Sequence, residues 1–403
     1  MKQFKYYISL LLCMLAMGTS SCKKMTDAEP LYSIDLTRSS HVGEGASYID
    51  PSEIDALIAR DKDIPYYQNL RRYKYDSDHQ VAFGWYGNWT GKGLDYEYSL
   101  RGLPDSVDFV SLWGGWRNID PIRRADLKYV QKVKGTRALA CILMFQIGDA
   151  ITPPIPEELQ KQGVSWNQWQ HRFWGWDVEK DGQWVSTPET IDAAIIKYAK
   201  AVADTIIKYD LDGLDIDAEP SYGQPFETNK ELWAYDKNGT RHRINLFVET
   251  FGKMMGPLAE TEEGRKKLFV IDGEPAAIGK DYGKYFNYFI IQAYGDADPG
   301  SLDSRYANVM DHYKDHMTPE EVARKMIWCA NFESAAAKGG QSPYDGDPQL
   351  IWFAKYMCDW KGQKYRKGGV GAFHMEYEYR VQGKKGTYPY LRSAIQIMNP
   401  AIH

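Results

Sequence analysis

The stretch that decides the fold reads LDGLDIDAEP and covers residues 211–220. A β-strand here places Asp215, Asp217 and Glu219 on one face, because side chains alternate along a strand. The alternate positions hold Leu, Ile and Ala, so the other face is apolar. Carboxyls this close raise one another's pKa, which allows one to stay protonated near neutral pH beside an ionised neighbour. The pattern therefore indicates a strand that carries acid–base chemistry.

Two other interpretations of this stretch are a calcium-binding loop and a solvated acidic edge. Calcium loops also alternate acids, but they need glycine turns between ligands rather than Leu, Ile and Ala. A solvated edge has no need of a buried apolar face. Catalysis is therefore the favoured interpretation.

The spacing of Asp212, Asp215, Asp217 and Glu219 resembles the signature of glycoside hydrolase family 18, the family of chitinases and endo-β-N-acetylglucosaminidases. The resemblance implies a (β/α)8 barrel with this stretch as its fourth strand. It also implies that Glu219 is the general acid/base and that Asp217 and Asp215 support it. Asp212 lies on the opposite side of the alternation, so we expect a structural role for it.

Seven further apolar runs have the length and composition of parallel strands covered on both faces. Helical patterns separate them, and eight strands alternating with helices predict the α/β class and a single (β/α)8 barrel. A Trp- and Pro-rich insertion at 151–185 interrupts the rhythm and is expected to be functional. The other expected strands cover 80–85, 107–113, 138–147, 267–272, 288–294, 325–330 and 369–375.

The N-terminus has the features of a targeting segment. Lys2 and Lys5 precede an apolar run at 8–17 that is too short to span a bilayer, and small residues lead to Cys22. This resembles a bacterial lipoprotein signal, which implies a lipid on Cys22 and a place at the cell envelope, on the outer-membrane surface. An ordinary secretory signal is the alternative. We expect a signal peptide at 1–21, a tether and helical lead-in at 22–76, and the barrel at 77–403.

Composition narrows the choice of partner and cofactor. The formal net charge is −5, so nucleic acid is not expected, because phosphate binding needs clustered Lys and Arg. Aromatic residues make up 14%, which suits packing on sugar rings. Cys141 and Cys329 lie in apolar runs and are expected to be buried thiols. His312 and His316 are four residues apart but lack a third ligand, so we expect no metal site. The implied mechanism requires no cofactor, and we expect a monomer.

Barrel enzymes place their working groups at the C-terminal ends of strands. At the sixth strand, Gln292 and Tyr294 face the same side, and the resemblance implies that they hold the 2-acetamido group of the substrate. The other strand ends supply aromatic, amide and acidic side chains suited to sugars. The expected substrate-binding residues are Trp85, Tyr86, Trp89, Trp113, Trp116, Gln146, Glu274, Asn331 and Glu376.

The pair Gln292 and Tyr294 resembles the endo-β-N-acetylglucosaminidase version of the family rather than the chitinase version. The implied activity is hydrolysis of the GlcNAc-β1,4-GlcNAc core of N-glycans by a retaining, substrate-assisted mechanism. The alternatives are a non-catalytic cell-surface glycan-binding protein on the same barrel and a chitinase-like hydrolase. Residues 373–376 read FHME where chitinases usually have Trp, and residues 146–149 read QIGD rather than Ser-x-Gly-Gly. Ala218 favours complex-type glycans slightly over high-mannose ones.

Overall fold

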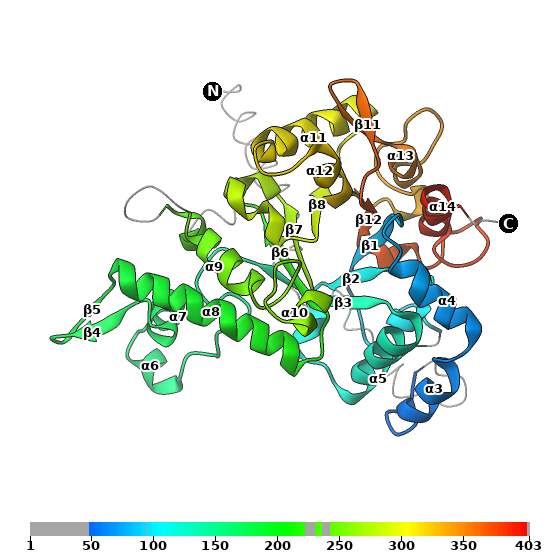
Figure 1. The fold of residues 1–403 in the computed structure, drawn as a ribbon. Coiled ribbons are helices and arrows are strands. Elements are labelled where there is room, and N and C mark those ends of the chain that lie inside the picture. The colour runs from blue at the N-terminus through cyan, green and yellow to red at the C-terminus, as the bar shows by residue number, and fades with distance from the viewer. Residues whose placement is uncertain (1–47, 94, 222–229, 236–241, 401–403) are drawn as a thin grey trace, which may run out of the picture.

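Eight parallel strands close into a barrel, in the spatial order β1-β12-β9-β8-β7-β6-β3-β2. The computed structural model describes residues 48–93, 95–221, 230–235 and 242–400 (Figure 1). The closed parallel sheet confirms the predicted (β/α)8 barrel. Its strands are β1 (Val81–Tyr86), β2 (Phe109–Leu112), β3 (Arg137–Leu143), β6 (Gly213–Ala218), β7 (Leu268–Gly273), β8 (Tyr288–Gln292), β9 (Met326–Asn331) and β12 (Gly369–Phe373).

The alternation of side chains divides the barrel into an interior and an outer core. The interior cluster is small and partly aromatic, with Phe83 and Trp85 from β1, Phe109 from β2 and Phe373 from β12. The opposite face of every strand packs against the helices in a much larger cluster. Because Asp215 and Asp217 have the parity of the interior, β6 directs both carboxyls inward.

The helices that follow the strands cover the outside of the barrel (Figure 1). The longest begins after a capping box at Thr187 with Pro188 in the first turn, as the sequence predicts. The sequence predicts an apolar stripe along this helix, of which Ile195, Val202 and Ile206 are buried and Ile191 is half-buried. These helices are α5 (Pro121–Tyr129), α8 (Pro188–Lys208), α9 (Arg243–Gly252), α10 (Glu262–Lys266), α11 (Pro299–Tyr313), α12 (Pro319–Lys325), α13 (Gln349–Lys355) and α14 (Pro389–Met398).

Within the described residues, two helices precede the first strand, and they pack against α5 and the turn of helix that follows it (Figure 1). The first, α3 (Ile54–Asp61), is the helix expected near residues 50–60. For the part of the lead-in after residue 60 the sequence predicts a connector, and this is wrong, because Pro65–Lys74 form a second helix, α4. Only Leu70 and Lys74 of α4 are buried, so its sequence carries little apolar periodicity. Arg71 ties this helix to the molecule by donating to the Val133 carbonyl at 2.6 Å.

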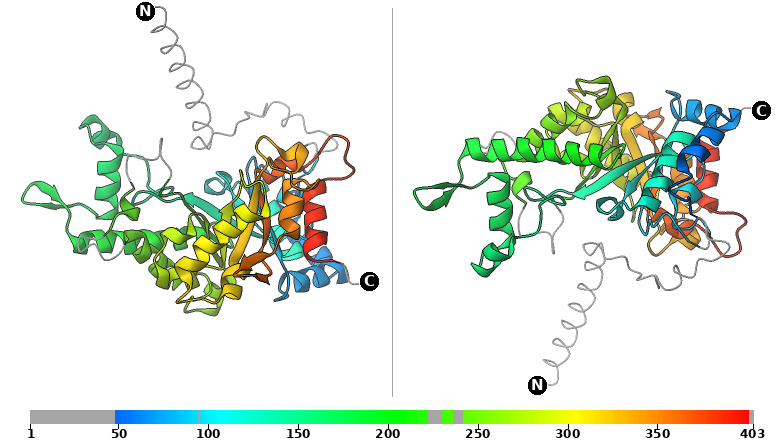
Figure 2. Two further views of the ribbon diagram at one scale, coloured as in Figure 1. Left: turned by 90° about the horizontal axis from the view of Figure 1, so that it is seen from above. Right: turned by 90° about the horizontal axis from the view of Figure 1, so that it is seen from below.

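The insertion at 151–185 forms an arm that projects from the barrel in both views of Figure 2. It contains α6 (Glu157–Lys161), α7 (Trp166–Trp174) and a hairpin of β4 (Val178–Lys180) and β5 (Gln183–Val185). His171 of α7 contacts Asp177 at 3.0 Å and Glu231 at 2.5 Å, which joins the arm to the segment after β6. The role expected for this insertion stays a prediction.

Several element ends differ from the sequence prediction. β3 ends at Leu143 instead of residue 147, because the Asp149 carboxylate accepts from the amides of Phe145 and Gln146 and turns the chain. After Asp347 and Pro348 the sequence predicts a helix from 349 to about 360, but the helix ends at Lys355. The residues beyond it form a hairpin of β10 (Cys358–Trp360) and β11 (Gln363–Tyr365). None of the helices in the described ranges has the length and apolarity that crossing a membrane requires. The expected signal peptide and Cys22 lie outside the described residues.

Candidate active site

The acidic residues of β6 lie at the C-terminal end of the barrel interior. Asp215 is fully buried, and Asp217 and Glu219 are nearly so, with exposed fractions of 5% and 7%. Asp212 has the opposite parity and a structural role, as predicted. Its Oδ2 accepts hydrogen bonds from Gln131 Nε2 at 2.7 Å and from the Ala138 amide at 2.9 Å.

Asp215 is held by two donors from neighbouring strands. Trp85 Nε1 on β1 donates to Asp215 Oδ2 at 3.1 Å, and Ser111 Oγ on β2 donates to the same oxygen at 2.6 Å. Burial raises the pKa of Asp215 to about 6, against the lowering effect of these hydrogen bonds. Donors to a carboxylate favour its ionised form, so the two contacts orient Asp215 and moderate its pKa.

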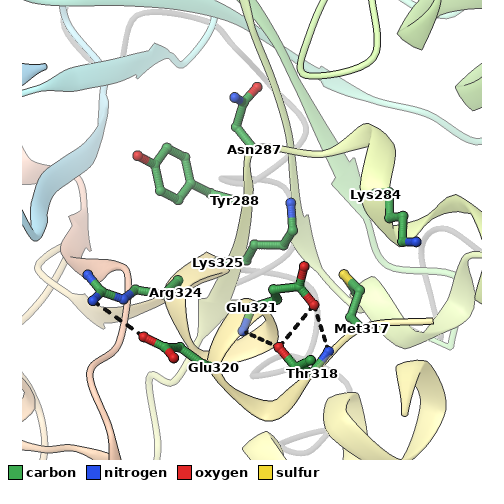
Figure 3. Close-up of a pocket in the computed structure, with 9 residues that line it drawn as sticks. All are labelled: Lys284, Asn287, Tyr288, Met317, Thr318, Glu320, Glu321, Arg324 and Lys325. Carbon is green, nitrogen blue, oxygen red and sulfur yellow. Dashed lines mark hydrogen bonds and ion pairs between the residues drawn. The ribbon is translucent and has the colours of Figure 1, made fainter. Parts of the chain in front are cut away.

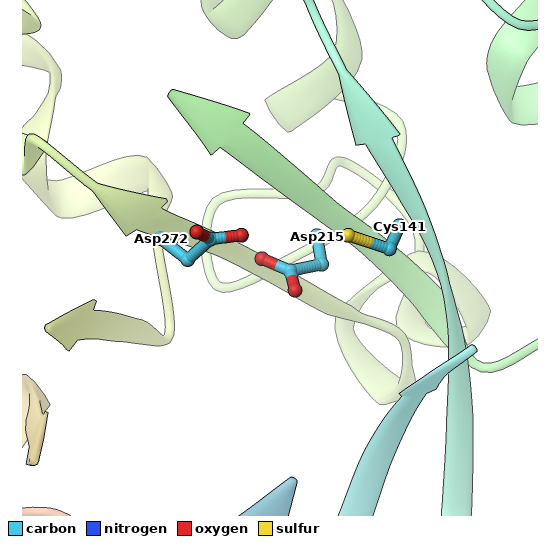
Figure 4. Close-up of side chains that lie close together, drawn as sticks. All are labelled: Cys141, Asp215 and Asp272. Atoms are coloured by element: carbon cyan, nitrogen blue, oxygen red, sulfur yellow. The ribbon is translucent and has the colours of Figure 1, made fainter. Parts of the chain in front are cut away.

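A fourth buried carboxyl, Asp272 at the end of β7, belongs to the same cluster and was not among the predicted site residues. It is paired in register with Asp217 of β6 and is fully buried. Gln292 Nε2, at the end of β8, donates to Asp272 Oδ1 at 2.8 Å. Figure 4 shows Asp272 pointing toward Asp215 across the barrel interior. The available signal was its position as the last residue of an expected strand, beside the acidic one.

The cluster is electrostatically strained. Burial raises the pKa of Asp217 well above its usual range, and the charges of Glu219 and Asp215 raise it further. The pKa of Asp272 is also raised well above its usual range, first by burial and then by Asp217 and Asp215. Within the described residues, one oxygen each of Asp215, Asp217 and Asp272 is buried without a hydrogen-bond partner. Such carboxyls cannot all be ionised at neutral pH.

Glu219 follows β6 and stands nearer the mouth of the barrel. Burial raises its pKa, a hydrogen bond from Gln292 lowers it, and the charge of Glu274 raises it again. Gly273, with φ +83°, permits this crowding, because a Cβ there would lie 2.4 Å from the Ala218 carbonyl oxygen. A raised pKa is the property that a general acid near neutral pH requires.

Tyr294, two residues beyond the last strand residue of β8, is half-buried beside this cluster. Burial raises the pKa of its hydroxyl well above the usual range, and Asp272, Asp217 and Glu219 are among the charges that add to the shift. Its ring lies 6.0 Å from that of Phe373, measured between centroids. The structure thus brings together all five residues predicted to be catalytic: Asp215, Asp217, Glu219, Gln292 and Tyr294.

Some of the predicted substrate-binding residues lie at this mouth. Trp85 touches Asp215, and the Trp113 ring lies 5.8 Å from Phe373. Glu274 accepts from the Ser221 amide at 3.1 Å and influences the pKa of Glu219. Asn331 ends β9 beside Phe373 and accepts from the Glu333 amide at 2.8 Å. Their binding roles stay predictions.

The remaining predicted aromatic residues belong to the outer core. Tyr86 donates to the carbonyls of Glu97 and Ser99, Trp89 Nε1 to Asp126 Oδ2, and Trp116 Nε1 to the Cys141 carbonyl. All three are at most 3% exposed, so the structure does not bring them to the carboxyls. Gln146 lies past the end of β3, where its backbone N–H donates to the Asp149 carboxylate. Strand-end position alone did not distinguish inward from outward side chains.

Glu376 lies between the ends of β12 and β1 and is paired with His374, the neighbouring residue at the same strand end. Its Oε1 lies 2.8 Å from Nδ1 of His374, which has φ +52°. The pair occupies the space above Gly87, since a Cβ at that glycine would lie 2.6 Å from Glu376 Oε1. His374 also lies 4.3 Å from the Phe373 ring, between centroids, which places the pair at the edge of the site.

One group has the composition of a metal site. Cys141, Asp215 and Asp272 each offer a ligand-type atom, and these atoms lie within 4.8 Å of one another (Figure 4). Burial and then the neighbouring carboxyls raise the pKa of the Cys141 thiol well above its usual range. His312 binds the Ile278 carbonyl at 2.7 Å, and His316 contacts Asp281 at 3.1 Å.

A cavity of about 620 Å³ lies at the opposite end of the barrel (Figure 3). Its lining includes Tyr288, the first residue of β8, and Lys325, which precedes β9. Arg324 contacts Glu320 at 3.6 Å, and Glu321 binds the Thr318 amide, so these charged groups have partners. The cavity is separate from the carboxyl cluster.

Known proteins are similar to this chain in sequence and in architecture. The model of glycoside hydrolase family 18, BT1044-like, matches residues 49–397. Endo-β-N-acetylglucosaminidase EndoS of Streptococcus pyogenes serotype M1 is 25% identical over 278 residues, which are 64% of this chain and 24% of EndoS. The chain thus spans about a quarter of the length of that relative.

Among solved structures, a Glu-to-Gln variant of BT1044 superposes with a TM-score of 0.66 at 29% identity, covering 87% of this chain and 94% of that one. An endo-β-N-acetylglucosaminidase from Cordyceps militaris gives a TM-score of 0.51 at 17% identity, covering 83% and 95%, which shows the fold alone. The match of the family model over most of the barrel, with the acidic strand inside it, shows that this chain belongs to glycoside hydrolase family 18.

Proposed function

We propose that the protein is an endo-β-N-acetylglucosaminidase that cuts the GlcNAc-β1,4-GlcNAc core of N-glycans. The observation that carries the proposal is the intact acid pair, Asp217 and Glu219, with the raised pKa of Glu219. A buried cluster of carboxyls with raised pKa values costs stability, which supports a catalytic role over glycan binding alone. The names of EndoS and of the Cordyceps militaris enzyme support the choice of substrate class.

The proposed mechanism retains configuration and uses the substrate's own acetamide. Glu219 protonates the leaving oxygen, and the acetamide oxygen attacks the anomeric carbon from the opposite face to give an oxazolinium ion. Asp217 accepts from the acetamide N–H and balances the positive charge that develops there. Tyr294 donates to the acetamide carbonyl oxygen and aims it at the anomeric carbon. Water activated by Glu219 then opens the oxazolinium ion.

The direct test is incubation of the purified protein with a glycoprotein that carries several N-glycan classes, followed by mass spectrometry. We expect released oligosaccharides ending in one GlcNAc and a protein that keeps the other GlcNAc. The masses also show which class is accepted, and complex-type glycans are the expected one. Glycan binding without release, from a protein that shows normal thermal unfolding, would instead support the binding-protein alternative. Cleavage of chitin oligosaccharides alone would support the chitinase-like one.

We also propose that Cys22 is the lipid-modified N-terminus of the mature protein and anchors it at the cell envelope. The basic residues, the apolar run and the small residues before Cys22 support this. Mass spectrometry of the mature N-terminus tests the proposal. Cleavage at another position, with Cys22 unmodified, contradicts it.

A further inference from the structure

The carboxyl cluster has a feature that the proposed mechanism does not use. Asp215 Oδ1, Asp217 Oδ1 and Asp272 Oδ2 are buried, and among the described residues the polar groups that face them are other carboxyls of the cluster and the Cys141 thiol. None of the three carboxyls forms an ion pair with a described Lys, Arg or His. A buried carboxylate oxygen without a donor is costly, and a proton shared between neighbouring carboxyls lowers that cost.

The three carboxyls differ in what surrounds them. Asp215 receives two donors on its other oxygen, from Trp85 and Ser111, and these stabilise its ionised form. Asp272 receives one amide donor, from Gln292, on Oδ1 only. Asp272 is within hydrogen-bonding reach of Asp215 and Asp217, and it is the register partner of Asp217. A proton on the Asp272 carboxyl therefore has an acceptor carboxyl within reach on β6, at Asp215 or at Asp217.

We propose that Asp272 is a protonated carboxylic acid in the active enzyme and donates a hydrogen bond to Asp217, which leaves Asp217 ionised toward the substrate. Asp272 is then a positioning residue that acts through Asp217. The arrangement lets two buried carboxyls stand side by side with one negative charge between them. The raised pKa of Asp272, caused first by burial, is consistent with a neutral acid.

The groups that face Asp272 come from all the neighbouring strands. The carboxyls nearest to it raise its pKa, so their charges favour the proton on Asp272. The two thiols are themselves kept protonated by burial. The titratable and charged groups around the cluster are Asp215, Asp217 and Glu219 from β6, Cys141 from β3, Cys329 from β9, Glu274 after β7, Tyr294 after β8, and Lys230 beside Glu219.

The proton itself is tested without any substrate. Infrared difference spectroscopy on exchange into heavy water detects protonated carboxyls, and Asp272→Asn should lose one such signal near pH 7. Asp149→Asn is a matched control for a different buried carboxyl. An unchanged protonated-carboxyl signal in Asp272→Asn overturns the proposal. So does a stoichiometric cation, found by elemental analysis of the purified protein and lost in Asp272→Asn.

The positioning role rests on the proposed function and is tested by rescue. An Asn at 272 can accept from Gln292 and donate to Asp217, as a protonated Asp does, so Asp272→Asn should keep near-wild-type turnover and an unshifted pH profile. Asp272→Leu has a similar size but no donor, and should lose on the order of 10²-fold in kcat. If Asp272 were ionised, Asp272→Asn would remove a charge and move the Glu219 limb of the pH profile to lower pH. A wild type that is inactive but shows the Asp272 signal would refute the function and not the proton.

Discussion

Buried charged groups are found at both ends of the barrel, but their hydrogen-bond partners differ. At the N-terminal end, buried ammonium groups are matched by backbone acceptors. Lys74 Nζ donates to the Val107 carbonyl at 2.6 Å and to Thr136 Oγ1 at 2.8 Å, and Lys367 Nζ donates to the carbonyls of Ala354 and Tyr356. At the C-terminal end, three buried carboxyls each keep an oxygen without a partner in the described structure.

The buried polar groups at the two ends of the barrel therefore serve different purposes: stability at the N-terminal end and chemistry at the C-terminal end. The lysines close the bottom of the barrel and join elements that the sheet does not connect, so their hydrogen bonds serve stability. The carboxyls repel one another and raise one another's pKa, which costs stability and prepares Glu219 and Asp217 for chemistry. Substitutions at the two ends should therefore have opposite signatures: loss of activity at the C-terminal end and loss of stability at the N-terminal end.

The largest effect is expected for Glu219→Gln. The variant keeps the shape of the side chain and removes the proton donor, so kcat should fall by on the order of 10²–10⁴. Stability should be unchanged or higher, because one charge leaves a repulsive cluster. Release of glycans from a glycoprotein measures the first effect and chemical unfolding the second. Turnover close to that of the wild type would show that Glu219 is not the general acid.

Asp217→Asn should be the next most damaging change. An Asn can still hydrogen-bond the acetamide, but it cannot balance the charge that develops there, so a loss on the order of 10²–10³ in kcat is expected. A synthetic sugar oxazoline bypasses the affected step and should still be transferred to an N-acetylglucosamine acceptor. The matched variant is Glu219→Gln, which should fail with both substrates. A sugar trapped covalently on Asp217 would contradict substrate assistance.

The sequence predicted the acidic strand and the barrel because both depend on local periodicity. It missed Asp272 because one Asp at the end of an apolar run looks the same as any strand terminus. Its role comes from pairing with β6 across the sheet, which no local pattern encodes. The opposite error was made for three aromatic residues. Their positions at strand ends predicted side chains that point into the barrel, but the side chains of Tyr86, Trp89 and Trp116 lie in the outer core. Side-chain direction past the last strand residue depends on tertiary contacts.

At the N-terminal end, Lys367→Met should destabilise the protein by about 1–3 kcal/mol, because two buried carbonyls lose their donor. Burial lowers the pKa of Lys367 from 10.5 to about 7. Between these values the unfolded chain holds more protons, so the stability of the wild type rises with pH in this range. The variant should lack this rise, and its deficit should therefore be larger near pH 9 than near pH 6. Urea unfolding at both pH values measures the difference, with exposed Lys364→Met as the control.

The smallest effects are expected for the removal of one buried hydroxyl at each end of the barrel. Because the two changes are chemically similar, they give the sharpest comparison of the two ends. Ser111→Ala removes the donor to Asp215 at 2.6 Å, and Thr136→Val removes the acceptor of Lys74 at 2.8 Å. Each change should cost on the order of 1 kcal/mol of stability. Only Ser111→Ala should alter the pH dependence of kcat/KM. Loss of the donor raises the pKa of Asp215 above its present value of about 6, so Asp215 protonates at a higher pH and the acid limb should move upward. An acid limb that shifts equally in both variants would mean that the two ends are not independent.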